Sequence, residues 1–129
     1  MAAHKVRQRA SKVASPERGD IYLVNFDPAV GAEIKKTRPA LVIQNDIGNE
    51  YSPITIVAAI TSKFEEPPYP TEVIMEPVES GLPLRSAVVL NQIRSVDRRR
   101  LARRLGHAGL KTMNRVDHAI QISLGLIKI

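Results

Sequence analysis

Cysteine and tryptophan are both absent from the 129 residues of the chain. Without cysteine the chain can form no disulfide, no thiolate metal site and no thiol nucleophile, which suits a protein of the cytoplasm. Aromatic residues make up only 4% of the sequence, whereas hydrophobic residues as a whole reach 43%. The core must therefore be built mainly from valine, isoleucine, leucine and alanine.

Long apolar runs are lacking as well. Every run is far shorter than the ~20 residues that span a bilayer, and the N-terminus has no apolar segment of the kind found in signal peptides. We therefore expect no membrane association. The length fits one domain. Residues 1–17 carry cations but no sustained apolar period, so we expect a disordered basic arm before a single domain over 18–129.

Charge is the first positive feature of the sequence. Nineteen lysines and arginines stand against thirteen aspartates and glutamates, which gives a net charge of +6 at pH 7. Such an excess of positive charge favours a polyanionic partner, such as a nucleic acid, an acidic protein or an anionic surface. Composition alone does not choose among these partners, and solubility is a sufficient reason for a mildly basic chain.

Runs of β-branched and apolar residues predict five or six strands. The predicted strands cover residues 20–26, 39–44, 54–61 and 71–75, followed by 86–90 and 92–96, which could instead form one long bent strand. The connecting segments are rich in proline, glycine and asparagine and are predicted as turns or loops. No helix alternates with the strands, so the sheet should be largely antiparallel.

Two helices are predicted after the strands. Asp97 could cap a short helix over residues 98–105, in which Leu101 and Leu105 are four positions apart. Apolar residues then recur every three or four positions from Leu110 to Ile127, which is typical of an amphipathic helix. The predicted fold is a β-rich α+β class: a small antiparallel, barrel-like sheet with a short helix and a C-terminal helix.

Most signature motifs of enzymes are missing, including those of dinucleotide binding, phosphate-binding loops, serine hydrolases and zinc proteases. His4, His107 and His118 are scattered along the chain, so neither a metal nor a cofactor is expected. The arginine-rich run 98–104 favours a solvated helix face over a phosphate-binding stripe, because it would cover all sides of a helix.

Arg38 and Thr61 attract attention because each lies at the end of a predicted strand beside a polar loop. If the two strands pair antiparallel, the start of one and the end of the other meet at the same edge of the sheet. A guanidinium presents a planar fork of donors that matches two phosphate oxygens, and a hydroxyl adds another donor. The pair could hold a phosphorane, although an exposed arginine and a strand-end threonine without any chemistry fit the same pattern.

Several blocks of sequence occur in a specific order. These blocks are RGDIYLVNFDP, GAEIKKTRPALVIQND, SPITIVAAITSK, PTEV and LNQIRSVDRRRL, followed by VDHAIQISLGL. In this order they resemble the MazF/PemK family of toxin endoribonucleases, over roughly residues 17–127. The resemblance implies a small antiparallel barrel-like sheet with a C-terminal helix, a homodimer, and metal-independent, sequence-specific cleavage of single-stranded RNA. It also implies a cognate antitoxin, which we expect to be acidic.

The resemblance also assigns residues. The catalytic arginine of the family falls on Arg38 and its catalytic threonine on Thr61. Contacts to RNA in the family come from the loop before that arginine and from the NQIR strand; here these positions are Glu33, Lys35, Lys36, Thr37 and Gln92. Cleavage would use the neighbouring 2′-hydroxyl as nucleophile and leave a 2′,3′-cyclic phosphate and a 5′-hydroxyl. No residue is assigned as general base.

Two other classes of function remain open. One is a toxin of the same fold that binds DNA gyrase and cleaves nothing, for which a phosphate clamp at Arg38 and Thr61 would be unnecessary. The other is a non-catalytic nucleic-acid-binding module, in which stacking aromatic side chains are expected. Only five aromatic residues are present: Tyr22, Phe26, Tyr51, Phe64 and Tyr69.

Overall fold

The computed structural model describes residues 15–26 and 37–129 of the chain. Its elements follow in the order β1 (Asp20–Asn25), β2 (Thr37–Val42), α2 (Asp46–Tyr51), β3 (Ile54–Thr61), β4 (Glu72–Met75), α3 (Pro77–Ser80), β5 (Ser86–Asp97), the 3₁₀ turn η1 (Arg98–Arg100), β6 (Leu101–His107) and α4 (Leu110–Ser123). The strands form one antiparallel sheet in the order β4-β5-β3-β2-β1-β6. The predicted β-rich α+β class is confirmed.

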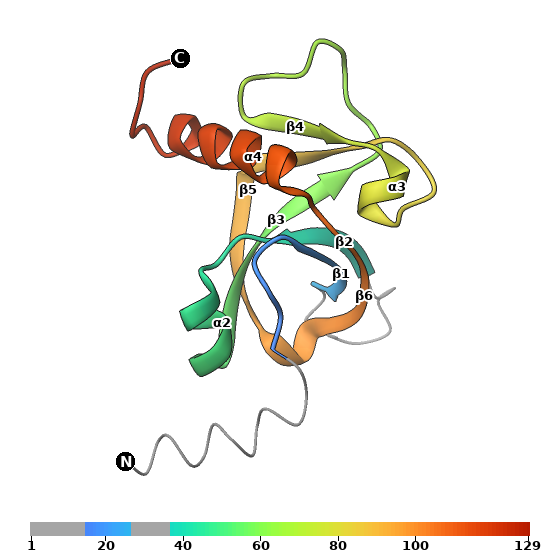
Figure 1. The fold of residues 1–129 in the computed structure, drawn as a ribbon, viewed down its shortest axis with the longest axis vertical. Coiled ribbons are helices and arrows are strands. Elements are labelled where there is room, and N and C mark those ends of the chain that lie inside the picture. Colours follow the sequence, from blue (N-terminus) through green and yellow to red (C-terminus); the bar gives the residue numbers. More distant parts are fainter. Residues whose placement is uncertain (1–14, 27–36) are drawn as a thin grey trace.

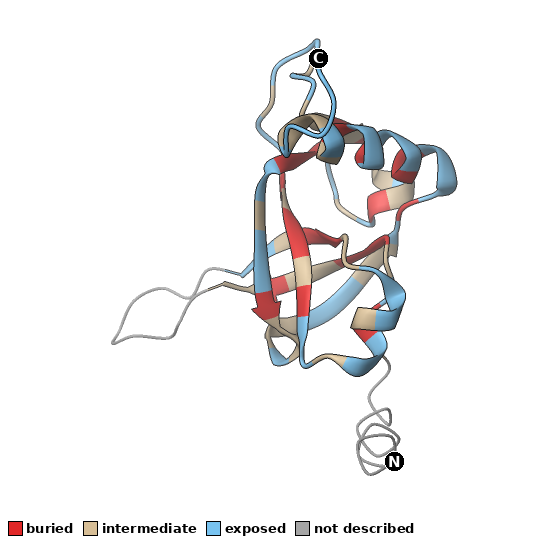
Figure 2. Ribbon diagram, turned by 90° about the vertical axis from the view of Figure 1, so that its left-hand side faces the viewer, coloured by how far each residue is buried: buried red, intermediate tan, exposed pale blue. Residues whose placement is uncertain are grey.

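The sheet is strongly curved. Figure 1 shows β1, β2 and β6 curling around one end of the molecule, while α4 lies across β4 and β5 at the other end. Buried residues lie on α4 and on strands β1 to β5, including the end of β2 and the start of β5 (Figure 2). Two clusters of buried side chains result: one around Leu41, Leu90 and Val116 under α4, and a second around Val24 and Val57 inside the curl. No described helix is long and apolar enough to cross a membrane.

The largest difference from the sequence-based prediction lies at residues 98–105, which were predicted to form a helix. Asp97 does cap the following turn, with its side chain accepting from the N–H of Arg99, but the turn lasts only three residues before β6 begins. Leu101 and Leu105 are four positions apart, a spacing that a strand also satisfies. The segment pairs antiparallel with β1 as β6. The arginine run 98–104 therefore lies on a 3₁₀ turn and a strand and forms no α-helix.

Two short helices occupy segments that were predicted as turns. In α2 the side chain of Asn45 accepts a hydrogen bond from the N–H of Gly48 at 2.7 Å, as an N-cap does. In α3, Pro77 starts the helix and Gly81 ends it at a φ of 73°. Both helices carry ordinary start and stop signals, but each is too short for an apolar period to appear in the sequence.

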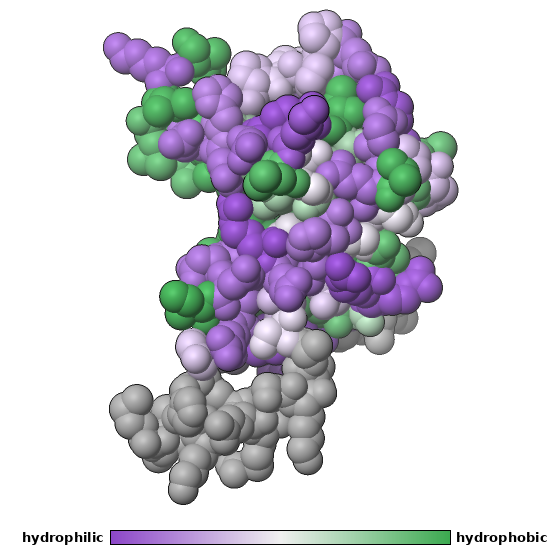
Figure 3. All heavy atoms as spheres, viewed as in Figure 1, coloured by the Kyte–Doolittle hydropathy of each residue, from purple (hydrophilic) through white to green (hydrophobic). Residues whose placement is uncertain are grey.

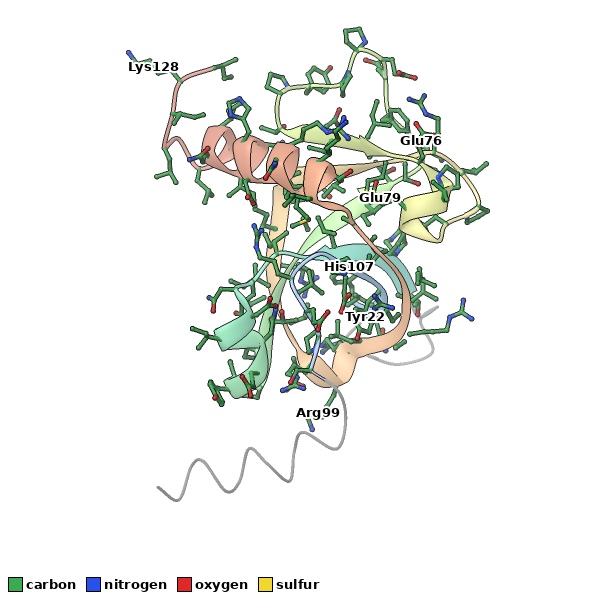
Figure 4. All side chains as sticks on the ribbon, viewed as in Figure 1. Tyr22, Glu76, Glu79, Arg99, His107 and Lys128 are labelled. Atoms are coloured by element: carbon green, nitrogen blue, oxygen red, sulfur yellow. The ribbon has the colours of Figure 1, made fainter. Side chains whose placement is uncertain are left out.

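The C-terminal helix is confirmed, but it ends at Ser123 rather than continuing to Ile127. Gly125 adopts a φ of 74°, and the N–H groups of Gly125 and Leu126 donate to the carbonyls of Ile122 and Gln121. This pattern is a Schellman motif, which closes a helix. At the other end, Glu79 from α3 accepts from the N–H of Gly109 and from the hydroxyl of Thr112, so a carboxylate caps α4 from outside (Figure 4).

The last three residues of the predicted N-terminal arm, 15–17, are within the described residues. Residues 1–14 are outside them. Pro16 is buried, and the N–H of Glu17 donates to Asp20 Oδ2 at 2.8 Å, so the domain includes these positions. Gly19 takes a φ of 100° as the chain turns into β1, a conformation that glycine adopts without strain.

Candidate active site

A pocket of about 600 Å³ lies where β2 begins and β3 ends. These two strands pair antiparallel with Ala40 opposite Ala59, so Arg38 and Thr61 each lie two residues further toward the same edge. Both line the pocket, as does Gln92 from β5. The structure therefore brings together three of the residues that the sequence singled out, from three different strands.

Arg38 is exposed at the start of β2 and makes no hydrogen bond or ion pair to any residue that the structure describes. The following proline disfavours helical backbone angles at Arg38, which keeps the residue extended. Behind it, Ala40, Leu41 and Val42 are fully buried and fix the strand in the sheet. A rigid strand thus carries a guanidinium whose donors bind no residue within 15–26 or 37–129.

The hydroxyl of Thr61 is held in place by the backbone of Lys63. Its Oγ accepts from the N–H of Lys63 at 3.1 Å and donates a long hydrogen bond of 3.4 Å to the carbonyl oxygen of Lys63. This local turn orients the side chain at the end of β3 and leaves Thr61 half-buried in the lining of the pocket. Lys63 lines the same pocket and adds a second cation beside Arg38.

Gln92 reaches the pocket because β5 is irregular there. Ala58 of β3 pairs with Ile93, whereas the next residue, Ala59, pairs with Val89, so three residues of β5 (Leu90, Asn91 and Gln92) bulge out of the ladder. Such a bulge re-aims side chains that regular pairing would not direct this way. The sequence predicted either two strands or one long bent strand between residues 86 and 96. The structure has one bent strand, β5.

Of the other predicted RNA-binding residues, only Thr37 lies within the described residues. It is exposed at the first position of β2, opposite Asn25 of β1. Glu33, Lys35 and Lys36 lie outside the described residues, so their predicted role stays a prediction.

Glu72 was not among the predicted site residues. This residue of β4 pairs with Val89 of β5, which pairs with Ala59 of β3, and all three line the pocket. No signal in the sequence could have placed Glu72 here, because its position depends on which strands become neighbours. Ser86 enters the lining for the same reason, whereas Ser62 lines the pocket because it follows Thr61 directly in the chain.

A second cluster of charge lies away from this pocket, around Asp20. Its carboxylate is buried, and Oδ1 accepts from Arg104 Nε at 3.0 Å and contacts His107 Nδ1 at 2.8 Å, while Oδ2 accepts from the N–H of Glu17. Burial by itself would raise the pKa of Asp20, but the hydrogen bonds from Glu17, His107 and Arg104 together lower that pKa below its usual value. Figure 4 shows His107 within the curl of the sheet.

Glu17, Asp20 and His107 present three potential metal-ligand atoms within 4.8 Å of one another. We assign no metal to them, because the cationic Arg104 donates to the same carboxylate oxygen that contacts His107. The arrangement is explained by charge pairing around one buried aspartate. His118 is elsewhere, on α4, beside a second pocket that also contains Arg85 and Asn114.

The chain is also similar to known proteins. Residues 17–124 match the family described as PemK-like, MazF-like toxin of type II toxin-antitoxin system. The chain belongs to this family. The endoribonuclease EndoA of Bacillus subtilis is 45% identical over 111 residues, which cover 86% of this chain and 96% of that relative. The predicted family and the predicted enzyme class, an endoribonuclease, are thereby confirmed.

Solved structures of this fold include complexes. A MazE-MazF crystal structure from Deinococcus radiodurans superimposes with a TM-score of 0.73 at 29% identity, covering 88% of this chain and 98% of that chain. An endoribonuclease in complex with its cognate antitoxin, from a mycobacterial species, has a TM-score of 0.70 at 25% identity and covers 89% and 100% of the two chains. The predicted barrel-like sheet with a C-terminal helix is therefore the fold of known members of the family.

Proposed function

We propose that this toxin is a sequence-specific endoribonuclease that cuts single-stranded RNA without a metal ion. Attack by the neighbouring 2′-hydroxyl would leave a 2′,3′-cyclic phosphate and a 5′-hydroxyl. The observation that carries the proposal is the meeting of Arg38 and Thr61 in one open pocket. A cation that makes no hydrogen bond to the described residues, beside an oriented hydroxyl, is suited to a phosphodiester that gains negative charge in the transition state.

Each side chain has a role that follows from its chemistry. Arg38 neutralises the charge on the non-bridging oxygens and donates a proton to the departing 5′ oxygen. A guanidinium has no lone pair for a proton, so Arg38 does not act as a base. The Thr61 hydroxyl donates to a non-bridging oxygen. Pairing of β2 with β3 holds the two groups in fixed positions, so the protein reorganises little when the charge develops.

The RNA would reach this pocket along the side where β2 begins. We assign RNA contacts to Glu33, Lys35, Lys36 and Thr37, which precede Arg38 in the chain, and to Gln92 on the bulge of β5. Gln92 can donate and accept at once, which suits recognition of a base edge. The cytoplasm, where such RNA is present, is the proposed place of action.

Two protein partners belong to the proposal. The first is a second copy of the chain: hydrophobic side chains gather beside α4 near the C-terminus (Figure 3), where Leu124, Leu126 and Ile129 are each more than half exposed. The second partner is a cognate antitoxin. The net charge of +6 favours an acidic segment, disordered when free, that occupies the RNA channel and folds on binding.

The loop between β3 and β4 supports a competitive mode for the antitoxin. Ser62 and Lys63 of this loop line the pocket directly after Thr61, so a chain that covers them also blocks RNA. Increasing RNA concentration should therefore relieve inhibition when the antitoxin can exchange. Inhibition that no amount of RNA relieves under these conditions would contradict direct occlusion.

One experiment tests the central proposal. Purified protein is incubated with long RNA in the presence of EDTA, and the new ends are mapped and tested for a 5′-hydroxyl. We expect cleavage at a short repeated sequence, unchanged by EDTA, and none when a single 2′-deoxynucleotide replaces the residue whose hydroxyl attacks. Cleavage of the deoxy substrate, or loss of activity in EDTA, would overturn the mechanism.

A further inference from the structure

We propose that Glu72 is the general base of the reaction, the group that takes the proton from the attacking 2′-hydroxyl. The inference rests on the endoribonuclease function proposed above and names a residue that the family motifs in the sequence did not identify. It follows from the charges that line the pocket and from the order of strands in its floor.

Among the described residues that line the pocket, three carry charged side chains: Arg38, Lys63 and Glu72. The first two are cations at neutral pH and hold no lone pair for a proton. The hydroxyls and the amide of Thr61, Ser62 and Gln92 are far weaker bases than a carboxylate. Within this part of the chain, Glu72 is therefore the lining group that can accept a proton.

The sheet places Glu72 on the correct face of the pocket. Ala59, Val89 and Glu72 lie directly opposite one another on β3, β5 and β4, so their side chains point to the same face. Thr61 lies two residues beyond Ala59 and shares that face. One strand separates β3 from β4, so their backbones are about 10 Å apart. Ala59 and Val89 lie between Thr61 and Glu72 in the lining of the pocket.

The carboxylate is already partly oriented. Its Oε1 accepts the N–H of Tyr69 at 3.1 Å, which fixes the side chain against the end of the β3–β4 loop. Its Oε2 makes no hydrogen bond to any residue within 15–26 or 37–129 and remains available to a ligand. Glu72 is half-buried and lines this pocket, and it also borders the second pocket beside His118.

Each change in bonding is accompanied by a proton transfer. Oε2 of Glu72 takes the proton of the 2′-hydroxyl as the O2′–P bond forms, and the P–O5′ bond breaks as Arg38 gives a proton to the departing oxygen. The products are the 2′,3′-cyclic phosphate and the 5′-hydroxyl. Transfer of the proton from Glu72 through water to Arg38 restores the starting state, so the cycle needs no other reactant. The cation and the carboxylate thus act on the two oxygens that change bonding.

The test compares Glu72→Gln with the wild-type protein on an oligonucleotide that contains a mapped cleavage site. Glutamine keeps an oxygen for the Tyr69 N–H but cannot take up the proton. Single-turnover rates are measured from pH 5 to 9, and affinity is measured with the same oligonucleotide carrying a 2′-deoxy residue at the cut. We expect the rate to fall about 10²–10⁴-fold, the range typical of a lost general base, with affinity unchanged within about threefold.

Two readouts separate a base from a structural residue. The wild-type rate should fall toward low pH, and this dependence should vanish in Glu72→Gln. Added formate should restore part of the activity of Glu72→Ala, because a small carboxylate can enter the vacated space. Glu76→Gln is the matched control: Glu76 lies just beyond β4 and pairs with Arg85 outside this pocket, so its rate and pH profile should equal those of the wild type.

The results separate a wrong assignment of Glu72 from a wrong proposed function. If the wild type cleaves and Glu72→Gln cleaves within about threefold of it at every pH, the assignment of Glu72 is overturned and the endoribonuclease proposal stands. A large loss in Glu72→Gln with the low-pH dependence retained and no rescue by formate also overturns it, since that result describes a structural residue. If the wild type cuts no RNA, the proposed function itself fails.

Discussion

Arg38 and Arg104 lie on the two strands that flank β1, yet their surroundings are opposite. Arg104 on β6 donates to the buried carboxylate of Asp20 at 3.0 Å, and this bond together with the charge of Asp20 raises the pKa of Arg104. Arg38 on β2 faces an open pocket and makes no hydrogen bond or ion pair to any described residue. An arginine whose donors are already used stabilises the fold, whereas one with open donors is available to an anionic substrate.

The largest expected effect is that of Arg38→Ala on cleavage. Loss of a single transition-state donor typically costs ~10²–10³ in rate, and a charged donor should cost at least as much. The midpoint of urea unfolding should change little, because Arg38 has no partner within the described part of the chain. Single-turnover cleavage and urea unfolding are measured on the same preparation.

Arg104→Gln is the matched control for that comparison. It should keep wild-type cleavage and lower the unfolding midpoint, because Asp20 loses a cationic partner. If Arg104→Gln lost activity while Arg38→Ala kept it, the distinction between the two arginines would be wrong.

Thr61→Ala should have the next largest effect, a loss of about 10²-fold in the cleavage rate, because the variant lacks a neutral donor at the phosphate. Thr61→Ser keeps the hydroxyl and its turn with Lys63, so it should retain most of the activity. Equal losses in the two variants would mean that the methyl group, rather than the hydroxyl, matters at this position.

Asp20→Asn should have no direct effect on catalysis and should destabilise the fold. Replacing the buried carboxylate leaves Arg104 and His107 without their anionic partner, which should cost about 1–3 kcal/mol in the free energy of unfolding. Urea denaturation at pH 7 measures this difference. Cleavage per folded molecule should stay within about threefold of the wild type.

The pH dependence of stability gives an independent check of the same cluster. The folded-state pKa of Asp20 is lowered, so its contribution is fully present above the unfolded value of about 3.9 and is lost as the pH falls below it. Wild-type stability should therefore decline more steeply than that of Asp20→Asn as the pH falls from 5 to 2. Parallel curves would show that the Asp20 carboxylate is not the group responsible.

Arg99→Gln should produce the smallest change. The side chain of Arg99 is 90% exposed and pairs with Asp97, whose pKa it lowers to about 2, chiefly through its side-chain hydrogen bond and also through its backbone N–H. Solvent-exposed pairs contribute little to stability. We expect no measurable shift in the unfolding midpoint, while NMR titration shows the pKa of Asp97 moving back toward its usual value.

Much of the fold could be predicted from local patterns. The strand at 54–61 and the start of the terminal helix at Leu110 follow directly from runs of β-branched residues and from the 3.6-residue period. The segment after Asp97 could not be predicted in this way. Two leucines four positions apart fit both a helix and a strand. The segment forms a strand because it pairs with β1, and this pairing joins residues far apart in the sequence.

The sequence by itself determined which strand ends carry Arg38 and Thr61, because a proline and a β-branched run define those ends locally. It also determined the family, through motifs whose order is read along the chain. Only the tertiary structure decided that Glu72 and Gln92 face the same pocket. Their positions depend on β5 lying between β3 and β4 and on three residues bulging from its ladder, and strand order and register are set by contacts between segments far apart in the sequence.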